Sequence, residues 1–271
     1  MPIAMQILTL PEIDGEGTTV LYRPSFSEKI SSLVLFFPGD ISDFAFSGLS
    51  DPLVVGTGLE TNYEFSLESI AWHLSSSIGV DEALLIFRPS RVVGSYSIYS
   101  NLLTCDVTGN PVWADLTSTL SSKNASKSML RILKLLRSEI EGFSATNIKV
   151  IGFSKGCTVI SAFLKEREPS LLRLIHSIKL VDPGSQFPRL LFPFCDDDYS
   201  VFPSGIKITV VCSPYQYSDP NRKWLRREID EFVCKVACEF RYYNLLENSL
   251  GGHFSIIPIA LVDDPYNLSN L

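Results

Sequence analysis

Short apolar runs recur along the whole chain and predict the strands of a sheet. The runs are rich in Val, Ile, Leu and Phe, and segments with Gly, Pro, Ser and Asp separate them. Eight strands are expected, at residues 5–10, 18–22, 33–37, 83–87, 148–152, 178–181, 206–212 and 240–245.

Four intervening segments predict helices, at residues 66–76, 127–140, 158–167 and 222–236. In the second of these, apolar residues recur at helical spacing and are expected to pack on the sheet: Met129, Ile132, Leu133, Leu136 and Ile140. Strands that alternate with helices are typical of parallel strands joined by crossover helices. The chain therefore predicts the α/β class, as a three-layer α/β/α sandwich with a mostly parallel eight-stranded sheet.

Length and connectors predict one domain over residues 1–271, since no internal repeat or low-complexity linker divides the chain. Two connectors, 88–123 and 182–205, are too long for simple turns. Both follow strands of the predicted sheet and leave its carboxyl edge, where ligands bind in such folds. We expect them to form the pocket wall. Four rings of the second connector either line this pocket or anchor the connector to the core: Phe187, Phe192, Phe194 and Phe202.

Charge and hydropathy exclude several classes of partner. The net charge is −7 and the chain has no run rich in Lys or Arg, which argues against nucleic acid, because phosphate binding needs clustered cations. The longest apolar stretches, 33–38 and 256–262, are far shorter than the ~18 residues of a membrane span. No transmembrane segment is expected, and the oligomeric state is left open.

Cysteine content and the amino terminus predict a cytoplasmic protein. Six cysteines in a chain of this length favour free thiols in a reducing compartment. The first 17 residues contain no Lys or Arg and carry Glu12, Asp14 and Glu16, the reverse of a cationic targeting peptide. No cofactor is expected, and Asp196, Asp197 and Asp198 are interpreted as a solvated loop rather than a metal site.

Gly152-Phe153-Ser154-Lys155-Gly156 has the G-x-S-x-G pattern of a nucleophile elbow. At an elbow the chain turns from strand to helix so tightly that small residues must flank the serine. Here a strand-like run precedes the motif and a helical segment follows it. The pattern predicts that Ser154 Oγ is exposed at the carboxyl edge of the sheet as a nucleophile.

A serine needs a base to take its proton, and His253 is the candidate. It lies in Leu250-Gly251-Gly252-His253-Phe254, beyond the last predicted strand, where the catalytic histidine of such folds lies on a loop. His73 falls inside a predicted helix and His176 just before a strand, so both are interpreted as surface or packing residues.

Two aspartates could orient this histidine. Asp219 lies in a turn beyond the strand 206–212 and is the first candidate, although Asp219-Pro220 is also a common helix start. Asp182 directly follows the strand 178–181 and is the alternative acid.

The oxyanion of the reaction needs backbone N–H donors. One is expected at Lys155, next to the nucleophile, and the second in the turn Pro38-Gly39-Asp40-Ile41, at Asp40 or Ile41. The Asp40 carboxylate would repel an oxyanion and is expected to point away.

With these residues in order, the chain resembles the α/β-hydrolase superfamily, and more closely the family of the human chromosome two open reading frame sixty-nine protein. The strings that carry the closer resemblance are Phe36-Phe37-Pro38-Gly39-Asp40, Phe65-Ser66-Leu67-Glu68, Gly152 to Cys157, Ser213-Pro214-Tyr215-Gln216, Asp219-Pro220, Arg222 to Trp224 and His253-Phe254. The Pro-Gly turn is also similar to that of lipid-droplet-associated hydrolases. The resemblance implies an α/β-hydrolase fold, a serine-hydrolase-like protein and an association with mitochondria.

The expected function is therefore a serine hydrolase that cleaves an ester, thioester or lipid through an acyl-enzyme on Ser154. The catalytic set is Ser154, His253 and Asp219 or Asp182. Transfer of the acyl group to an acceptor other than water uses the same intermediate. The alternative is a catalytically inactive binding or scaffolding protein with the same fold.

Overall fold

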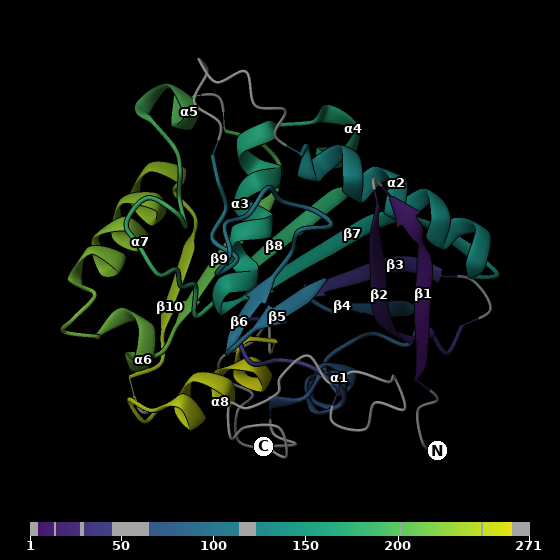
Figure 1. The fold of residues 1–271 in the computed structure, drawn as a ribbon, viewed down its shortest axis with the longest axis horizontal. Helices are drawn as coiled ribbons and strands as arrows, with labels where there is room; N and C mark the ends of the chain where they lie inside the picture. Colours follow the sequence, from purple (N-terminus) through teal and green to yellow (C-terminus); the bar gives the residue numbers. More distant parts are fainter. Residues whose placement is uncertain are drawn as a thin grey trace.

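The structure is a computed structural model, and it describes residues 5–13, 15–27, 30–44, 65–113, 123–200, 202–244 and 246–261. Its centre is a sheet with strands β1 (Gln6–Ile13), β2 (Glu16–Arg23), β3 (Ile30–Phe37), β4 (Glu82–Phe87), β7 (Phe143–Phe153), β8 (Ile175–Val181), β9 (Lys207–Cys212) and β10 (Glu239–Tyr242). Their spatial order is β1-β2-β4-β3-β7-β8-β9-β10 (Figure 1). The pairs β1–β2 and β2–β4 are antiparallel, and the strands from β4 to β10 are parallel.

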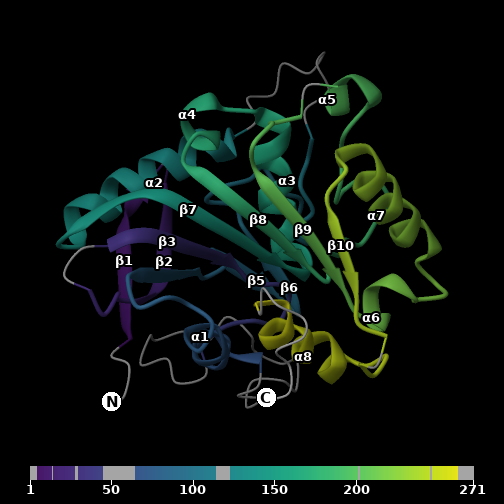
Figure 2. The ribbon, with the colours of Figure 1, turned by 180° about the vertical axis from the view of Figure 1, so that it is seen from behind.

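Helices cover both faces of this sheet. The helices are α1 (Leu67–Ser75), α2 (Ala125–Glu139), α3 (Cys157–Glu166), α4 (Pro169–Leu172), α5 (Asp196–Ser200), α6 (Pro214–Tyr217), α7 (Lys223–Val236) and α8 (Leu250–Leu261). In Figure 1, α2, α3 and α7 lie in front of the strands, and Figure 2 shows α1 and α8 together on the other side. The arrangement is the predicted three-layer α/β/α sandwich.

Alternation along the strands builds a core on each face. In β3, Leu33 and Leu35 pack into the cluster that contains Ile132 of α2 and Phe163 of α3. Val34 and Phe36 point the other way, into the cluster that contains Ile70 of α1 and Phe254 of α8. Because both faces are covered, the central strands are apolar on both sides, and this explains why they appear as continuous apolar runs in the sequence.

The parallel register brings four strand ends to one edge of the sheet. Phe37 of β3 pairs with Gly152 of β7, and Phe153 pairs with Val181 of β8. Val181 in turn pairs with Val211 of β9. The residues that follow these strands therefore lie next to one another, although they are far apart in the chain.

All eight predicted strands and all four predicted helices are present in the structure, and the predicted fold class is confirmed. The connector 88–123 also contains a small hairpin of β5 (Arg91–Val93) and β6 (Tyr96–Ile98). Its residues 114–122 are outside the described residues.

The prediction of a loop around His253 was wrong, because α8 forms there. Gly251, Gly252 and Pro258 all disfavour helix by intrinsic propensity. Burial of Phe254, Ile256 and Ile257 against the sheet outweighs this preference.

Aromatic rings anchor the second connector, 182–205. Phe192 stacks on Phe232 of α7 with ring centroids 4.1 Å apart, and Phe194 and Phe202 also contact Phe232. Phe187 is exposed. Of the two interpretations of these rings, the structure supports anchoring for the three that contact α7.

All six cysteines are free thiols. Within the described ranges, no helix combines the length and the apolar character that a membrane crossing requires.

Candidate functional site: Ser154, Asp182 and His253 at the carboxyl edge

Ser154 lies at the turn between β7 and α3, in a backbone conformation that is rare for a residue with a side chain. Its φ is +52°, in the left-handed region. The flanking glycines explain how the turn closes. A Cβ atom on Gly156 would lie 2.0 Å from Phe37 O, and one on Gly152 would lie 2.9 Å from Cys157 Cα. The glycines of the motif are therefore sterically required, as the elbow interpretation predicted.

Asp182 holds His253. Asp182 directly follows β8, and its Oδ2 lies 2.6 Å from His253 Nδ1. The Ser213 N–H donates to Asp182 Oδ1 at 2.8 Å, and the Ser213 hydroxyl donates to Oδ2. The carboxylate is fully buried and accepts all three hydrogen bonds. His253 Nε2 is then the ring nitrogen that has no hydrogen-bond partner among the described residues.

Asp219 does not lie against His253, and this corrects the expectation for the first candidate acid. Its Oδ2 accepts from Arg222 Nε at 2.7 Å, and its Oδ1 accepts from Asn221 N–H at 2.8 Å. Partial burial works to raise the pKa of Asp219, but these hydrogen bonds outweigh it and lower the pKa below its ordinary value. The carboxylate closes the turn between α6 and α7, whereas Asp182 is brought to the site by the register of β8 on β7.

The short helix α6 contributes two residues to which the sequence analysis assigned no role. The Tyr215 ring stacks on the His253 ring, with centroids 4.6 Å apart and an interplanar angle of 28°. Gln216 Nε2 lies 3.4 Å from Ser154 Oγ in a long hydrogen bond. Among the described residues, no hydrogen bond joins Ser154 Oγ to His253. The signal in the sequence was Ser213-Pro214, an N-cap and a proline that start a helix directly after a strand.

The turn after β3 contacts the other side of Ser154. A Cβ atom on Gly39 would lie 2.6 Å from Ser154 Cβ, so only glycine permits this approach. The Ile41 N–H already donates to Ser95 O at 3.0 Å, which removes it as an oxyanion donor. The Asp40 N–H has no partner among the described residues. Lys155 N–H lies in the first turn after the elbow, where backbone N–H groups lack intrahelical partners.

The Lys155 side chain is buried beside this turn. Its ammonium donates to Thr108 O, lies 3.5 Å from Asp40 Oδ1 and faces the Tyr96 ring at 5.2 Å. Asp40 Oδ1 also accepts the Ser97 N–H at 2.8 Å, so the carboxylate is directed at β6. Burial raises the pKa of Asp40, and the Lys155 ammonium opposes part of this rise. Lys155 thereby ties the segment 96–109 to the elbow.

Three non-glycine residues of this site have left-handed backbone conformations. Ile41, Ser154 and Asp182 have φ values of +59°, +52° and +44°. They follow β3, β7 and β8, which are neighbouring strands. Each such residue is strained by about 1–3 kcal/mol, and such strain clusters at functional sites. The value for Ile41 is the most unusual, because its side chain is β-branched.

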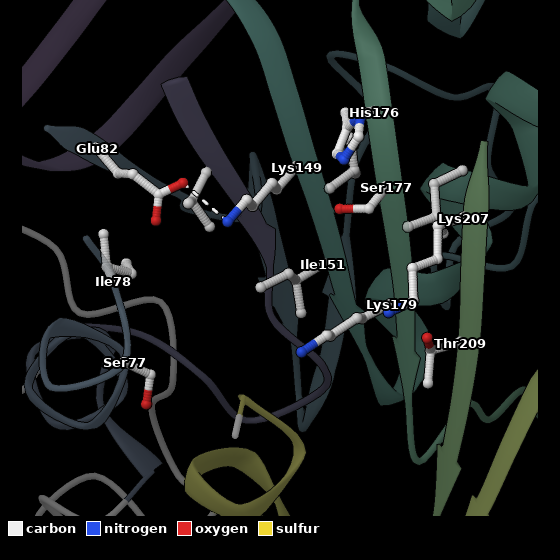
Figure 3. Close-up of a pocket in the computed structure, with 13 residues that line it drawn as sticks. Ser77, Ile78, Glu82, Lys149, Ile151, His176, Ser177, Lys179, Lys207 and Thr209 are labelled. Carbon is white, nitrogen blue, oxygen red and sulfur yellow. Dashed lines mark ion pairs between the residues drawn. The ribbon is translucent and has the colours of Figure 1, made fainter. Parts of the chain in front are cut away.

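A separate cavity of about 170 Å³ lies elsewhere on the sheet (Figure 3). Its walls include Lys149 of β7, Lys179 of β8 and Lys207, the first residue of β9. None of its lining residues belongs to the group around Ser154 and His253. Parallel sheets of this kind bind ligands at the carboxyl edge, and we therefore take the Ser154 region as the candidate site.

Several solved structures with a similar fold are esterases. The chain is similar to esterase Est22 with 13% identity and a TM-score of 0.55, over 95% of this chain and 76% of that one. It is similar to the thermophilic carboxylesterase EstE1, cloned from a metagenomic library, with 13% identity and a TM-score of 0.53, over 96% and 88% of the two chains. For Est1E from Butyrivibrio proteoclasticus the identity is 11% and the TM-score 0.51, over 94% and 95%. At these identities the likeness establishes the α/β-hydrolase fold.

Sequence comparison gives the family. No curated protein matches the chain. The profile of the C2orf69 family matches residues 6–139 and 114–237, which together span most of the chain. The protein therefore belongs to the C2orf69 family.

Proposed function

We propose that this protein is a serine hydrolase that uses Ser154 as nucleophile, His253 as general base and Asp182 as the acid that orients the base. The observation that carries the proposal is the 2.6 Å contact between Asp182 Oδ2 and His253 Nδ1, next to a serine held at an elbow with φ of +52°. A buried carboxylate on Nδ1 fixes the tautomer whose Nε2 accepts a proton, and it stabilises the imidazolium that then forms.

The reaction would follow from these positions. Ser154 Oγ passes its proton to His253 Nε2 and bonds to the carbonyl carbon of the substrate, whose oxygen becomes an oxyanion. The oxyanion collapses, and the leaving group departs with the proton from His253. Water then attacks the acyl-enzyme in the same way, with its proton going to His253 and returning to Oγ as the C–Oγ bond breaks.

Two backbone N–H groups would stabilise the oxyanion, those of Lys155 and Asp40. Lys155 directly follows the nucleophile, and Asp40 lies in the turn whose Gly39 contacts Ser154. Preorganised donors of this kind stabilise charge more effectively than water, because they need no reorientation as the charge forms. The Asp40 carboxylate is directed at Ser97 and Lys155, and does not compete for this place.

The proposed substrate is a small-molecule ester, thioester or lipid. The structural neighbours are named as esterases, and a serine with a histidine base and an orienting carboxylate cleaves esters without a metal or a cofactor. The connectors 88–123 and 182–205 leave the carboxyl edge beside Ser154 and would form the pocket wall. A cytoplasmic location stays a prediction of the sequence.

One observation favours a second function, a binding protein of the same fold without turnover. Within the described residues, Ser154 Oγ bonds to Gln216 and has no hydrogen bond to His253. In active enzymes this bond is often long in the free state and shortens when substrate binds, so we retain hydrolysis as the first proposal.

Labelling with a fluorophosphonate probe tests the two functions. The wild-type protein should be labelled at a single site and should hydrolyse p-nitrophenyl acetate with a burst of one equivalent. Ser154→Ala should lose both the label and the burst while it unfolds at the same temperature. A wild-type protein that is not labelled, or a label that persists in Ser154→Ala, would transfer the conclusion to the binding protein.

A further inference from the structure

Gln216 is a buried polar residue that contacts the reacting atom of the proposed nucleophile. Its side chain is 3% exposed, and its Nε2 lies 3.4 Å from Ser154 Oγ. Its Oε1 is buried and has no hydrogen-bond partner among the described residues. Buried polar atoms are almost always paired, so an unpaired one indicates that the position of the side chain serves another purpose.

The surroundings of Gln216 hold the carboxamide at this place. A Cβ atom on Gly184 would lie 2.4 Å from Gln216 Nε2 and 2.8 Å from Cδ, so the amide lies directly on the glycine. The Gly184 N–H donates to Ser154 O at 3.3 Å, which ties this surface to the elbow. The Ser213 hydroxyl caps α6 and also donates to Asp182. The segment from Ser213 to Gln216 therefore positions both the Asp182 carboxylate and the Gln216 amide.

The orientation of the amide makes it a donor to the serine. With Nε2 on Ser154 Oγ, the acceptor oxygen and one of the two Nε2 hydrogens are left unpaired among the described residues. If the amide were turned by 180°, an NH₂ group with two donors would be left unpaired in the same place. Unpaired buried N–H groups are rarer than unpaired C=O groups, which favours the donor orientation.

We propose that Gln216 is a further catalytic residue that donates a hydrogen bond to Ser154 Oγ. The proposal rests on the proposed function. When Oγ loses its proton to His253, and again when the acyl–Oγ bond breaks, negative charge develops on Oγ. A hydrogen bond to a charged oxygen is roughly twice as strong as one to a neutral oxygen, so the contact stabilises the transition state more than the resting hydroxyl. The Gln216 amide would act on Ser154 Oγ, whereas the backbone N–H groups of Lys155 and Asp40 would act on the carbonyl oxygen of the substrate.

Two isosteric variants test the donor role. Gln216→Met keeps the volume and removes the donor, and Gln216→Glu keeps the shape but presents a carboxylate at pH 8. The measurement is the rate of fluorophosphonate labelling, with kcat for p-nitrophenyl acetate and the midpoint of thermal unfolding for each protein. We expect labelling to slow on the order of 10-fold to 10²-fold in Gln216→Met and further in Gln216→Glu, with KM nearly unchanged. The wild-type protein should be labelled fastest, Gln216→Met more slowly and Gln216→Glu most slowly.

Other orders would overturn the proposal. A packing role predicts that Gln216→Glu, as the closer isostere, labels faster than Gln216→Met. An acceptor role for the amide predicts that Gln216→Glu matches or exceeds the wild type. If the wild-type protein does not react at Ser154, the proposed function itself is overturned. This result is obtained without any Gln216 variant, so it can be distinguished from a failure of the Gln216 proposal alone.

A backbone variant keeps the test decisive if the Gln216 variants do not fold. Gly184→Ala places a methyl group against Nε2 and should displace the amide, so its labelling rate should fall by a similar factor. Gly17→Ala is the matched control, because a Cβ atom there has no neighbour within 4 Å among the described residues. Wild-type labelling in a folded Gly184→Ala would contradict the donor role.

Discussion

Asp182 Oδ2 and His253 Nδ1 lie 2.6 Å apart, although 71 positions separate the two residues in the chain. Asp182 is brought to the site by the pairing of β8 with β7, and His253 by the packing of α8 against the sheet. The contact therefore exists only when the helix on one face and the centre of the sheet are both in place.

Replacement of Asp182 by Asn should abolish most turnover. The amide would leave the imidazole without its orienting carboxylate and favour the wrong tautomer, at a loss on the order of 10⁴ in kcat. Steady-state hydrolysis of p-nitrophenyl acetate measures this loss, and circular dichroism checks the fold. Asp219→Asn is the matched control and should reduce kcat by less than about 10-fold, because Asp219 bonds to Arg222 and Asn221. The reverse ranking would return the role to Asp219.

A methyl group on Gly39 should disable the site through its backbone. In Gly39→Ala the new Cβ would lie 2.6 Å from Ser154 Cβ, so the turn that carries the Asp40 N–H must move away. Loss of one oxyanion donor reduces turnover by about 10²–10³. Turnover is measured beside Gly17→Ala, where the added methyl group contacts no atom of the described part of the chain within 4 Å. Normal turnover in Gly39→Ala would exclude this turn as part of the oxyanion site.

Removal of the Lys155 ammonium should destabilise the fold mainly through Asp40. Loss of one partner from a buried ion pair costs about 3–5 kcal/mol, and since the Asp40 side chain is 32% exposed we expect about 1–3 kcal/mol for Lys155→Met. Burial raises the pKa of Asp40, so its charged form is the costly one, and the loss should be larger at pH 8 than at pH 5.

A double-mutant cycle checks this assignment. Urea unfolding of Lys155→Met, Asp40→Asn and the double variant should show that the double variant recovers part of the loss. Strictly additive losses would mean that the two side chains do not interact.

Asp198 should stabilise the protein at neutral pH and lose this effect in acid. Partial burial works to raise the pKa of Asp198, but hydrogen bonds from Lys165 Nζ and the Cys195 N–H lower it to about 2. The unfolded value is about 3.9, so the stabilisation is complete above that pH and is lost as the pH falls towards 2. Asp198→Asn should cost about 1–2 kcal/mol at pH 7 and less at pH 3, by urea unfolding. If Asp198→Asn lowers the free energy of unfolding equally at pH 7 and pH 3, the ion pair is not the source of the stabilisation.

The sheet was predictable because each of its strands is marked by a pattern of neighbouring residues in the sequence. Strands buried on both faces need continuous apolar runs, and such runs are visible in the sequence without any knowledge of their neighbours. The helix α8 was not predictable in the same way. Its glycines and proline oppose helix, and its stability comes from the packing of Phe254 and Ile257 in a core that the rest of the chain builds.

The candidate site was predictable only in part, because some of its contacts join residues that are far apart in the chain. Ser154 carries a motif that acts over five residues, and His253 was the one late histidine. The choice between Asp182 and Asp219 depended on strand register, which places Val181 beside Phe153 and thereby Asp182 beside the elbow. Gln216 belongs to a string that carries the family resemblance, but no role follows from that string, and its contact with Ser154 spans 62 positions.

The left-handed conformations at Ile41, Ser154 and Asp182 bear on how far this protein can be made heat-resistant. Glycine would relax each of these positions, but at Ser154 and Asp182 it would remove the side chains on which the proposed chemistry depends. At Ile41 the N–H bonds to Ser95 O through the main chain and would survive the replacement, but glycine would remove a side chain that is buried in the core. None of the three positions therefore offers a gain in thermal tolerance that leaves both the core and the proposed chemistry intact.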